Sequence, residues 1–330
     1  MIVPVVIAHA DWGTSRKKRQ VAMAWLVSGA VGPGPRYLVI SLAPAPDGLS
    51  RQGDLLQELR AAASPGQAMV GFDFPIGLPR AYAEAAGIGS FPDFLDTIGS
   101  PPWHEFGVVA RHRGEITLRR PFYPYAPGGA KREHLYLQLG LSAQQLRRRC
   151  EGKDAETMFW TLGGKQVGKG ALAGWQVLAA ARNRRPGIAL WPFAGPLPRL
   201  LDGRDRIVVT ETYPREYYHH VRVPGTPANR WSKRRQANRL TLLPGLLRWA
   251  ESLGVAWHRD ILCRAEEGFS AGANGEDEFD AVVGLLAMIS VVTGTVPTGE
   301  PGDDPAISSI EGWILGRASS SGNLDRPGYA

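Results

Sequence analysis

The chain has 330 residues, of which 44% are hydrophobic and 21% charged, so it is long enough for one large domain or two small ones and is not a disordered chain. Its formal net charge of +7 favours polyanionic partners, although a solvated, arginine-rich surface explains the same charge. No apolar run approaches the roughly 18 to 20 residues that cross a bilayer. The N-terminus lacks the basic region of a signal peptide, and the two cysteines fit no metal-ligand spacing, so we expect a cytoplasmic protein without a membrane partner.

The first quarter of the chain predicts the element order β-β-β-α-β. Residues 2–10 are apolar and β-branched and end at a turn, which is typical of a buried strand. The helix is expected from about Asp54, because Leu55, Leu56 and Leu59 share one helical face. The other strands are expected at 20–29, 36–43 and 67–79.

Residues 85–200 interrupt this order, because they are rich in Pro, Gly, Trp and Arg. They contain irregular helical stretches at 142–152 and 170–185. Strand-like patterns resume afterwards, so we interpret residues 85–200 as an insertion in a single domain of residues 1–317. The remaining elements are expected to be a fifth strand at 206–218, helices at 240–254 and 274–294, and a disordered tail at 318–330.

Acidic residues stand at the ends of several of these elements. Asp11 follows the first strand, Asp73 lies between two phenylalanines in the fourth, and Glu211 lies in the fifth. Asp277 and Asp280 are three residues apart and share a face of the last helix. Each has a structural explanation: a turn, an ion pair with arginine, or a favourable charge at a helix N-terminus. Asp73 is the hardest to explain structurally, because a buried carboxylate needs a cation, a donor or a metal.

A metal site follows if the first and fourth strands are parallel neighbours. Adjacent strands lie about 4.8 Å apart, so their acids would meet at one edge of the sheet. Ligands bind at such edges in open α/β sheets. Clustered carboxylates repel one another, and Mg²⁺ or Mn²⁺ would relieve that repulsion better than zinc, which prefers other ligands.

Five short motifs between about residues 5 and 316 support one resemblance. The stretches "ADWG", "GFDFPIGLP", "ETYP", "DEFDAVVGLLA" and "EGWILG" resemble, in the same order, the motifs of domain of unknown function family 429, a group of predicted ribonuclease H-like nucleases. The resemblance implies an α/β fold. Its mixed five-stranded sheet would have three antiparallel strands followed by parallel ones, with flanking helices and a large insertion.

The resemblance also implies an activity, namely hydrolysis of phosphodiester bonds in nucleic acid with two Mg²⁺ or Mn²⁺ ions. Asp11, Asp73, Asp277 and Asp280 match the superfamily's metal-binding positions, and Glu211 matches a motif of the narrower group as a further catalytic residue. Glu311 lies in such a motif without an assigned role. The type of nucleic acid, the mode of cleavage and the oligomeric state stay open.

Basic residues could hold the phosphates of such a substrate. They are Arg16, Lys17, Lys18 and Arg19 after the first strand, and Lys165 and Lys169 in the Gly-rich stretch "GGKQVGKGA". A solvated hairpin turn explains the first group equally well, and an ordinary surface loop the second. The Gly-rich stretch is not a P-loop, because Gly170 stands where Mg²⁺ binding needs Ser or Thr.

Two other functions remain as alternatives. The stretch "DWGTSR" also resembles the first phosphate loop of sugar kinases of the actin and hexokinase-like group, in which Asp11 and Thr14 would serve ATP, but no second phosphate loop follows. A nucleic-acid-binding module without catalysis would need the basic clusters but not the acids. The tryptophans of the insertion, among them Trp103, Trp160, Trp175 and Trp191, suit core packing or, alternatively, stacking on bases. The histidines show no zinc spacing.

Overall fold

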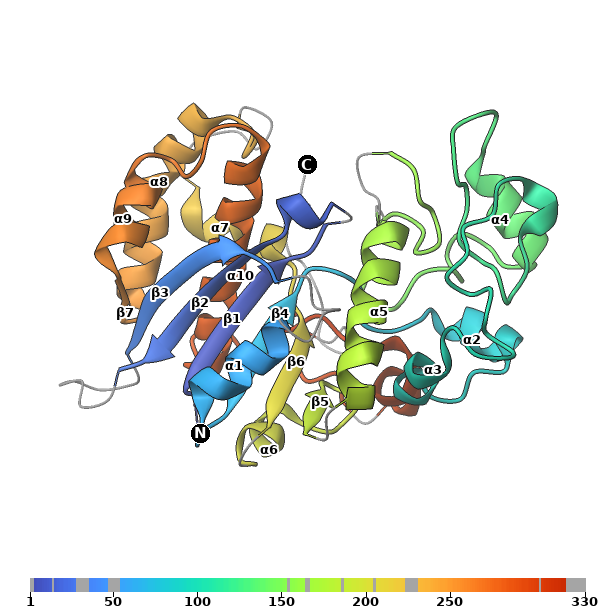
Figure 1. The fold of residues 1–330 in the computed structure, drawn as a ribbon, viewed down its shortest axis with the longest axis horizontal. Helices are drawn as coiled ribbons and strands as arrows, with labels where there is room; N and C mark the ends of the chain where they lie inside the picture. The colour runs from blue at the N-terminus through green and yellow to red at the C-terminus, as the bar shows by residue number, and fades with distance from the viewer. Residues whose placement is uncertain are drawn as a thin grey trace. The chain divides into compact units, whose positions relative to one another are not determined.

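The computed structural model describes residues 3–13, 15–27, 36–46, 54–152, 155–163, 167–184, 187–203, 206–222, 231–302 and 304–318. They form an α/β protein with a mixed seven-stranded sheet in the order β5-β6-β4-β1-β2-β3-β7 (Figure 1). The strands are β1 (Val6–Asp11), β2 (Gln20–Leu26), β3 (Tyr37–Pro44), β4 (Ala68–Phe72), β5 (Ile188–Leu190), β6 (Ile207–Glu211) and β7 (Val255–Trp257).

The strand pairing agrees with the predicted order of elements. β1 and β2 are antiparallel, as are β2 and β3, whereas β4 is parallel to both β1 and β6. The prediction of an α/β fold with a mixed sheet is therefore confirmed. The predicted count of five strands is wrong, because β5 and β7 add two strands of three residues each, too short to show a period-2 pattern. The narrower ribonuclease H-like assignment stays a prediction.

The helices include all the long ones expected from the sequence. They are α1 (Leu55–Ala63), α2 (Arg80–Ala86), α3 (Phe91–Thr97), α4 (Arg132–Leu139), α5 (Val167–Arg184), α6 (Leu197–Leu201), α7 (Tyr218–Val221), α8 (Gln236–Ser252), α9 (Arg259–Glu266) and α10 (Ala273–Val292). Residues 142–152 form turns instead of the expected helical stretch. There the buried Arg148 side chain turns back to Glu151, with 2.9 Å between Nε and Oε1. Within the described ranges, none of the helices has the length and apolar character needed to cross a bilayer.

Contacts divide the chain into two compact units. Unit 1 comprises residues 1–73, 196–300 and 314–330, and unit 2 comprises residues 74–195 and 301–313. The organisation as one domain with an insertion at about 85–200 stays a prediction. The tail expected to be disordered lies, from residue 319 onwards, outside the described residues.

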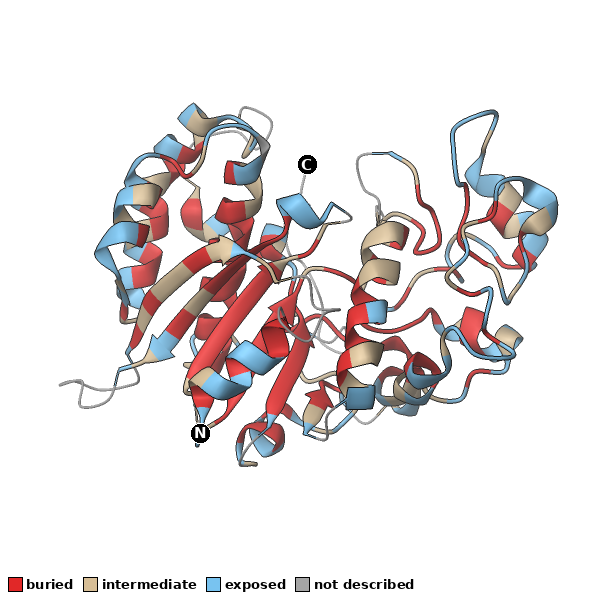
Figure 2. Cartoon of the chain, in the orientation of Figure 1, coloured by how far each residue is buried: buried red, intermediate tan, exposed pale blue. Residues whose placement is uncertain are grey.

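Helices α1 and α10 cover the sheet of unit 1 from its two sides (Figure 1). The α10 segment from Phe279 to Val292 is buried throughout, whereas α1 buries Leu55, Leu56 and Leu59 and exposes its outer face (Figure 2). α10 approaches the sheet closely, because a Cβ atom at Gly284 would lie 2.3 Å from the His9 ring of β1. This close approach fixes the distance between α10 and β1.

Aromatic rings form the core of unit 2. Trp175 of α5 is fully buried, packs edge-on against Phe91 and donates its indole N–H to the Pro75 carbonyl oxygen at 2.7 Å. Trp103, Trp160 and Trp191 are buried as well, with at most 8% of each exposed. Core packing of these four tryptophans is confirmed, and their burial leaves no face open for a base.

Candidate active site

The ends of β1 and β4 bring Asp11 and Asp73 together. Ala10 pairs with Phe72 across the two parallel strands, so the next residue on each strand is an aspartate at the same edge of the sheet. The backbone N–H of Trp12 donates to Asp73 Oδ1 at 2.6 Å, which fixes the second carboxylate beside the first. The expected convergence of these two acids therefore follows from the register of the sheet.

Helix α10 adds Asp277 and Asp280 from above the sheet. His9 and Asp11 lie on one face of β1, because side chains alternate along a strand. Gly284 lies over His9, and Asp280, four residues earlier, shares its face of the helix and comes over Asp11. Asp11 interacts electrostatically with Asp280 and Asp277 and also hydrogen-bonds with Asp277. We call Asp11, Asp73, Asp277 and Asp280 the carboxylate cluster.

Burial and mutual repulsion make the carboxylate cluster hard to ionise. Burial is the main cause that raises the pKa of Asp11 well above its usual range, and the negative charges of Asp73 and Asp280 add to it. Burial also raises the pKa of Asp73, although the Trp12 N–H and a hydrogen bond from Asp11 oppose the shift. Of the two, Asp11 is shifted more strongly toward its protonated form, and its single O–H can be donated to Asp73 or to Asp277.

Burial raises the pKa of Asp280, and two partners that the sequence did not reveal oppose that rise. Tyr218 at the start of α7 donates its hydroxyl to Oδ1 of Asp280 at 2.5 Å, and Lys233 pairs with Oδ2. Lys233 also lies 3.2 Å from an oxygen of Glu276. Burial alone would lower the pKa of Lys233, but the negative charge of Asp280 raises it above its ordinary value. The site thus contains a permanent positive charge of its own.

The carboxylate of Asp277 is also harder to ionise than a free carboxylate. Burial raises its pKa from 3.8 to about 6, against the opposing effect of a hydrogen bond from Asp11. The folded protein thus holds this proton more tightly than the unfolded chain does. The resulting stability is fully present below about pH 4 and is lost as the pH rises through about 6.

We therefore expect the variant Asp277→Asn to gain stability relative to the unmodified protein as the pH rises from 4 to 7, because the amide carries no charge to desolvate. Urea unfolding midpoints measured with a chelator at several pH values test this. A difference between the two proteins that stays constant across this range would show that Asp277 titrates normally.

The carboxylate cluster fits a hard divalent cation by the chemistry of its donors. All four side chains offer oxygen, and Oδ2 of Asp277 is buried without a hydrogen-bond partner. The positions of these side chains fit a metal ion less well than their chemistry does. Across the described ranges, no three His, Cys, Asp or Glu side chains are arranged to hold a metal ion. Asp280 is engaged by Tyr218 and Lys233. Asp11, Asp73 and Asp277 are thus the residues best suited to bind a metal, which would replace the hydrogen bonds among them.

Glu211 is not brought into the carboxylate cluster. It pairs with Phe72 across β4 and β6, so it lies on the Phe72 face of the sheet, opposite to the face of Asp73. Its backbone carbonyl accepts from Leu315 N–H at 2.9 Å. The position of Glu211 at the end of a strand was predicted, but the face of the sheet on which its side chain lies depends on the register between β4 and β6.

The basic residues after Asp11 differ in exposure. Arg16, Lys17 and Lys18 form a short turn of 3-10 helix and are exposed, and Lys18 acts electrostatically to lower the pKa of Asp277. Arg19 is 4% exposed, its guanidinium lies 4.0 Å from the centre of the Trp12 ring, and its Nε donates to the Gly13 carbonyl at 2.9 Å. Arg19 thus supports the turn, and the other three residues face solvent.

The second group of basic residues lies in unit 2. Lys169 is half-buried in the first turn of α5, and Lys165 lies outside the described residues, as does Thr14 of the kinase-like motif. A Cβ atom at Gly168 would lie 2.7 Å from the Met158 carbonyl oxygen, so this glycine permits close packing of a helix.

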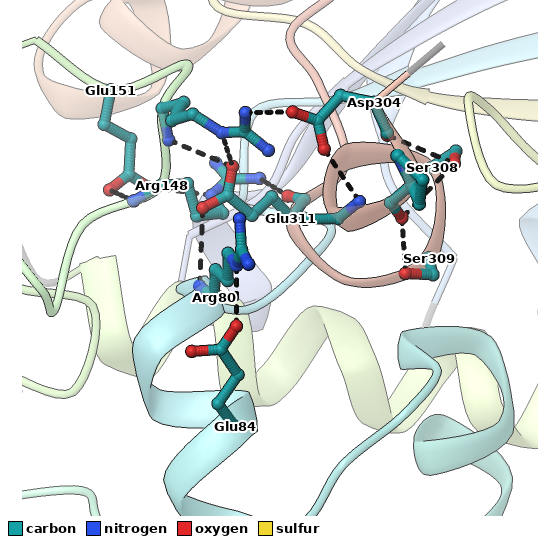
Figure 3. A network of polar contacts seen from close by, with 11 residues as sticks. Arg80, Glu84, Arg148, Glu151, Asp304, Ser308, Ser309 and Glu311 are labelled. Atoms are coloured by element: carbon teal, nitrogen blue, oxygen red, sulfur yellow. Dashed lines mark hydrogen bonds and ion pairs between the residues drawn. The ribbon is translucent and has the colours of Figure 1, made fainter.

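Glu311 lies in a polar network of unit 2 (Figure 3). Its Oε2 lies 2.8 Å from Nε of Arg149, its Oε1 accepts from the Arg80 backbone N–H at 3.4 Å, and its carbonyl oxygen accepts from Arg148 at 3.1 Å. A Cβ atom at Gly77 would lie 2.0 Å from that same carbonyl oxygen. These contacts give Glu311 a structural role in connecting residues 304–311 to the rest of unit 2.

The histidines also have structural surroundings. His134 hydrogen-bonds with the Tyr123 hydroxyl at 3.0 Å, and His220 stacks on Trp249 with ring centres 4.6 Å apart. Burial lowers the pKa of His9 to about 3, so this ring is neutral beneath α10.

Comparisons of the whole chain with protein-family models, with curated proteins and with solved structures found no match.

Proposed function

We propose that this chain is a metal-dependent nuclease that hydrolyses phosphodiester bonds in nucleic acid. One observation carries the proposal: strand register and helix packing bring Asp11, Asp73, Asp277 and Asp280, from three distant parts of the sequence, into one cluster with raised pKa values. Burying like charges together is costly for folding, and perturbed carboxylates of this kind are typical of functional sites.

The residues of the cluster would have separate roles in the reaction. Asp11, Asp73 and Asp277 would hold one or two Mg²⁺ or Mn²⁺ ions, which polarise a phosphate oxygen and lower the pKa of a bound water. The Trp12 N–H fixes the orientation of Asp73. Tyr218 and Lys233 oppose the rise in the pKa of Asp280 that burial causes, and so favour its charged form.

The exposed residues Arg16, Lys17 and Lys18 would bind the phosphates next to the reacting bond. They follow Asp11 after a short turn, and Lys18 is close enough to Asp277 to influence its pKa. Positive side chains beside a carboxylate cluster bring a polyanion to it despite the repulsion.

A cleavage assay decides this proposal. We expect the purified protein to cut at least one labelled RNA, DNA or hybrid substrate with Mg²⁺ or Mn²⁺, and to cut none of them with a chelator, because the cluster needs a cation. An ATP-binding titration run in parallel distinguishes the kinase. Saturable, metal-dependent ATP binding without cleavage of any substrate would contradict the proposal and favour the kinase. Salt-dependent binding of nucleic acid without cleavage under any metal would favour a pure binding module.

A further inference from the structure

Unit 2 carries a hollow, with a volume of about 420 Å³, that the carboxylate cluster does not explain. Arg111, Tyr123, Tyr125 and the loop 126–130 line it. Ligand pockets for small organic groups have volumes of about 300 to 1,000 Å³, so this hollow can take one nucleotide.

The floor and one wall of the hollow are held in place. Tyr123 is 4% exposed, its backbone N–H donates to the Phe159 carbonyl at 3.0 Å, and its hydroxyl hydrogen-bonds with His134. The backbone N–H of Tyr125 donates to the Ala110 carbonyl at 2.8 Å. These contacts hold the Tyr123 ring and the Tyr125 backbone in place without a ligand, which reduces the entropic cost of binding.

The other wall is an exposed aromatic ring next to a cation. Tyr125 is 62% exposed, more than the other exposed tryptophan and tyrosine residues of the described chain, Trp25 (44%) and Tyr213 (39%). The guanidinium of Arg111 lies 5.4 Å from the centre of this ring, and in the described part of the chain no carboxylate pairs with it. A planar π surface beside a positive charge is the combination that binds a base together with its phosphate.

The segment that carries the hollow has an excess of positive charge. Residues 111–132 contain six arginine or lysine residues and one acid, so they account for +5 of the chain's formal net charge of +7. The single acid, Glu115, is already engaged by Arg120 at 3.0 Å and His112 at 3.3 Å. The backbone N–H of Arg111 also donates to Glu115 at 2.7 Å, and the charge of Arg111 acts on that carboxylate. The Arg111 guanidinium itself lies at the Tyr125 ring, where it can also face a ligand.

We infer that this hollow binds an unpaired base of single-stranded nucleic acid, with the base stacked on Tyr125 and a neighbouring phosphate beside Arg111. The inference rests on the proposed function, because it takes nucleic acid as the partner, and it adds the substrate class. Stacking requires a free base face, so a duplex with all its bases paired cannot use the hollow. An acidic peptide would satisfy the charge but would supply no base.

Two ligands of equal charge distinguish the contribution of base stacking to the affinity from that of electrostatic attraction. A labelled single-stranded thymidine oligonucleotide and an abasic oligomer of the same length are titrated with the full-length protein in a chelator, so that nothing is cleaved. We expect Tyr125→Ala to weaken binding of the thymidine oligonucleotide about fivefold or more and to leave the abasic oligomer unchanged, whereas Tyr125→Phe keeps the affinity. Arg111→Gln should weaken the binding of both ligands.

Trp25→Ala is the matched control, because Trp25 is an exposed aromatic residue (44%) on β2, at the end of the strand away from Asp11. This variant should bind both ligands like the unmodified protein. Equal binding of the two ligands by the unmodified protein, or an equal loss for both in Tyr125→Ala, would overturn the inference. Neither result would touch the proposed nuclease, which the cleavage assay with metal tests separately and on duplex substrates too.

Discussion

Replacing Asp11 with Asn is expected to reduce nucleic-acid cleavage by more than about a hundredfold, since the loss even of an outer partner of a metal ligand costs about 10- to 100-fold. The amide N–H can still donate to Asp73, as a protonated Asp11 does, so the sheet edge keeps its geometry. Binding of the substrate should stay about the same, because a neutral amide replaces a carboxyl group whose raised pKa favours its neutral form. Single-turnover cleavage and equilibrium binding in a chelator measure the two effects separately.

The complementary variant neutralises Arg16, Lys17 and Lys18 together. It should weaken binding to every sequence and reduce the slope of log affinity against log salt concentration by about one for each phosphate that these side chains no longer bind. Arg19 is kept, because its burial against Trp12 makes any change there structural. Two results would contradict the assignment of catalysis to the acids and of phosphate binding to the basic residues. One is that Asp11→Asn weakens binding as strongly as cleavage, and the other is that the triple variant binds nucleic acid normally.

The sequence predicted the meeting of Asp11 and Asp73 for a reason that the structure confirms. Both residues follow an apolar strand, and the parallel register that pairs Ala10 with Phe72 places the next residues side by side. Asp280 was predictable as well, because the acidic first turns and apolar body of α10 mark a helix that must lie on the sheet. For Glu211 the strand position was correct, but the face of the sheet needed the β4–β6 register, which no sequence pattern contains.

Tyr218 and Lys233 could not have been found in the same way. Their contacts with Asp280 join α7 and the turn before α8 to the middle of α10, and nothing in the spacing of these residues along the chain indicates the pairing. The only sequence signal is chemical: a buried aspartate requires a donor or a cation, and "KRR" and "EYY" are among the stretches that could supply one. The strands β5 and β7 were missed because three residues carry too little periodicity.

Lys233 offsets part of the repulsion within the cluster. Its ammonium group compensates Asp280 and reaches Glu276, while Asp11 and Asp73 share a proton. The cluster therefore has two internal means of reducing its repulsion, a lysine and a proton. A metal ion must displace at least the proton, so binding of the metal should depend on pH.

The largest expected change in stability is the response to metal. Adding Mn²⁺ or Mg²⁺ should raise the melting temperature, because an ion present at 100 times its dissociation constant stabilises the folded state by about 2.7 kcal/mol. The rise should be greater at about pH 8 than at about pH 5, since protons compete for carboxylates with raised pKa values. Differential scanning calorimetry with metal and with a chelator, at both pH values, measures this response.

Asp73→Asn should remove most of that rise without unfolding the protein. The amide oxygen can still accept the Trp12 N–H, which donates to Asp73 at 2.6 Å, and the variant buries one charge fewer, so its melting temperature in a chelator should match or exceed that of the unmodified protein. The matched control is Asp260→Asn in α9, where the side chain is 84% exposed and lies outside the cluster; this variant should respond fully to metal. An equal rise in all three proteins would place the metal elsewhere on the chain. If metal did not raise the melting temperature of the unmodified protein at either pH, Lys233 and the shared proton, and not a metal ion, would be what offsets the repulsion within the cluster.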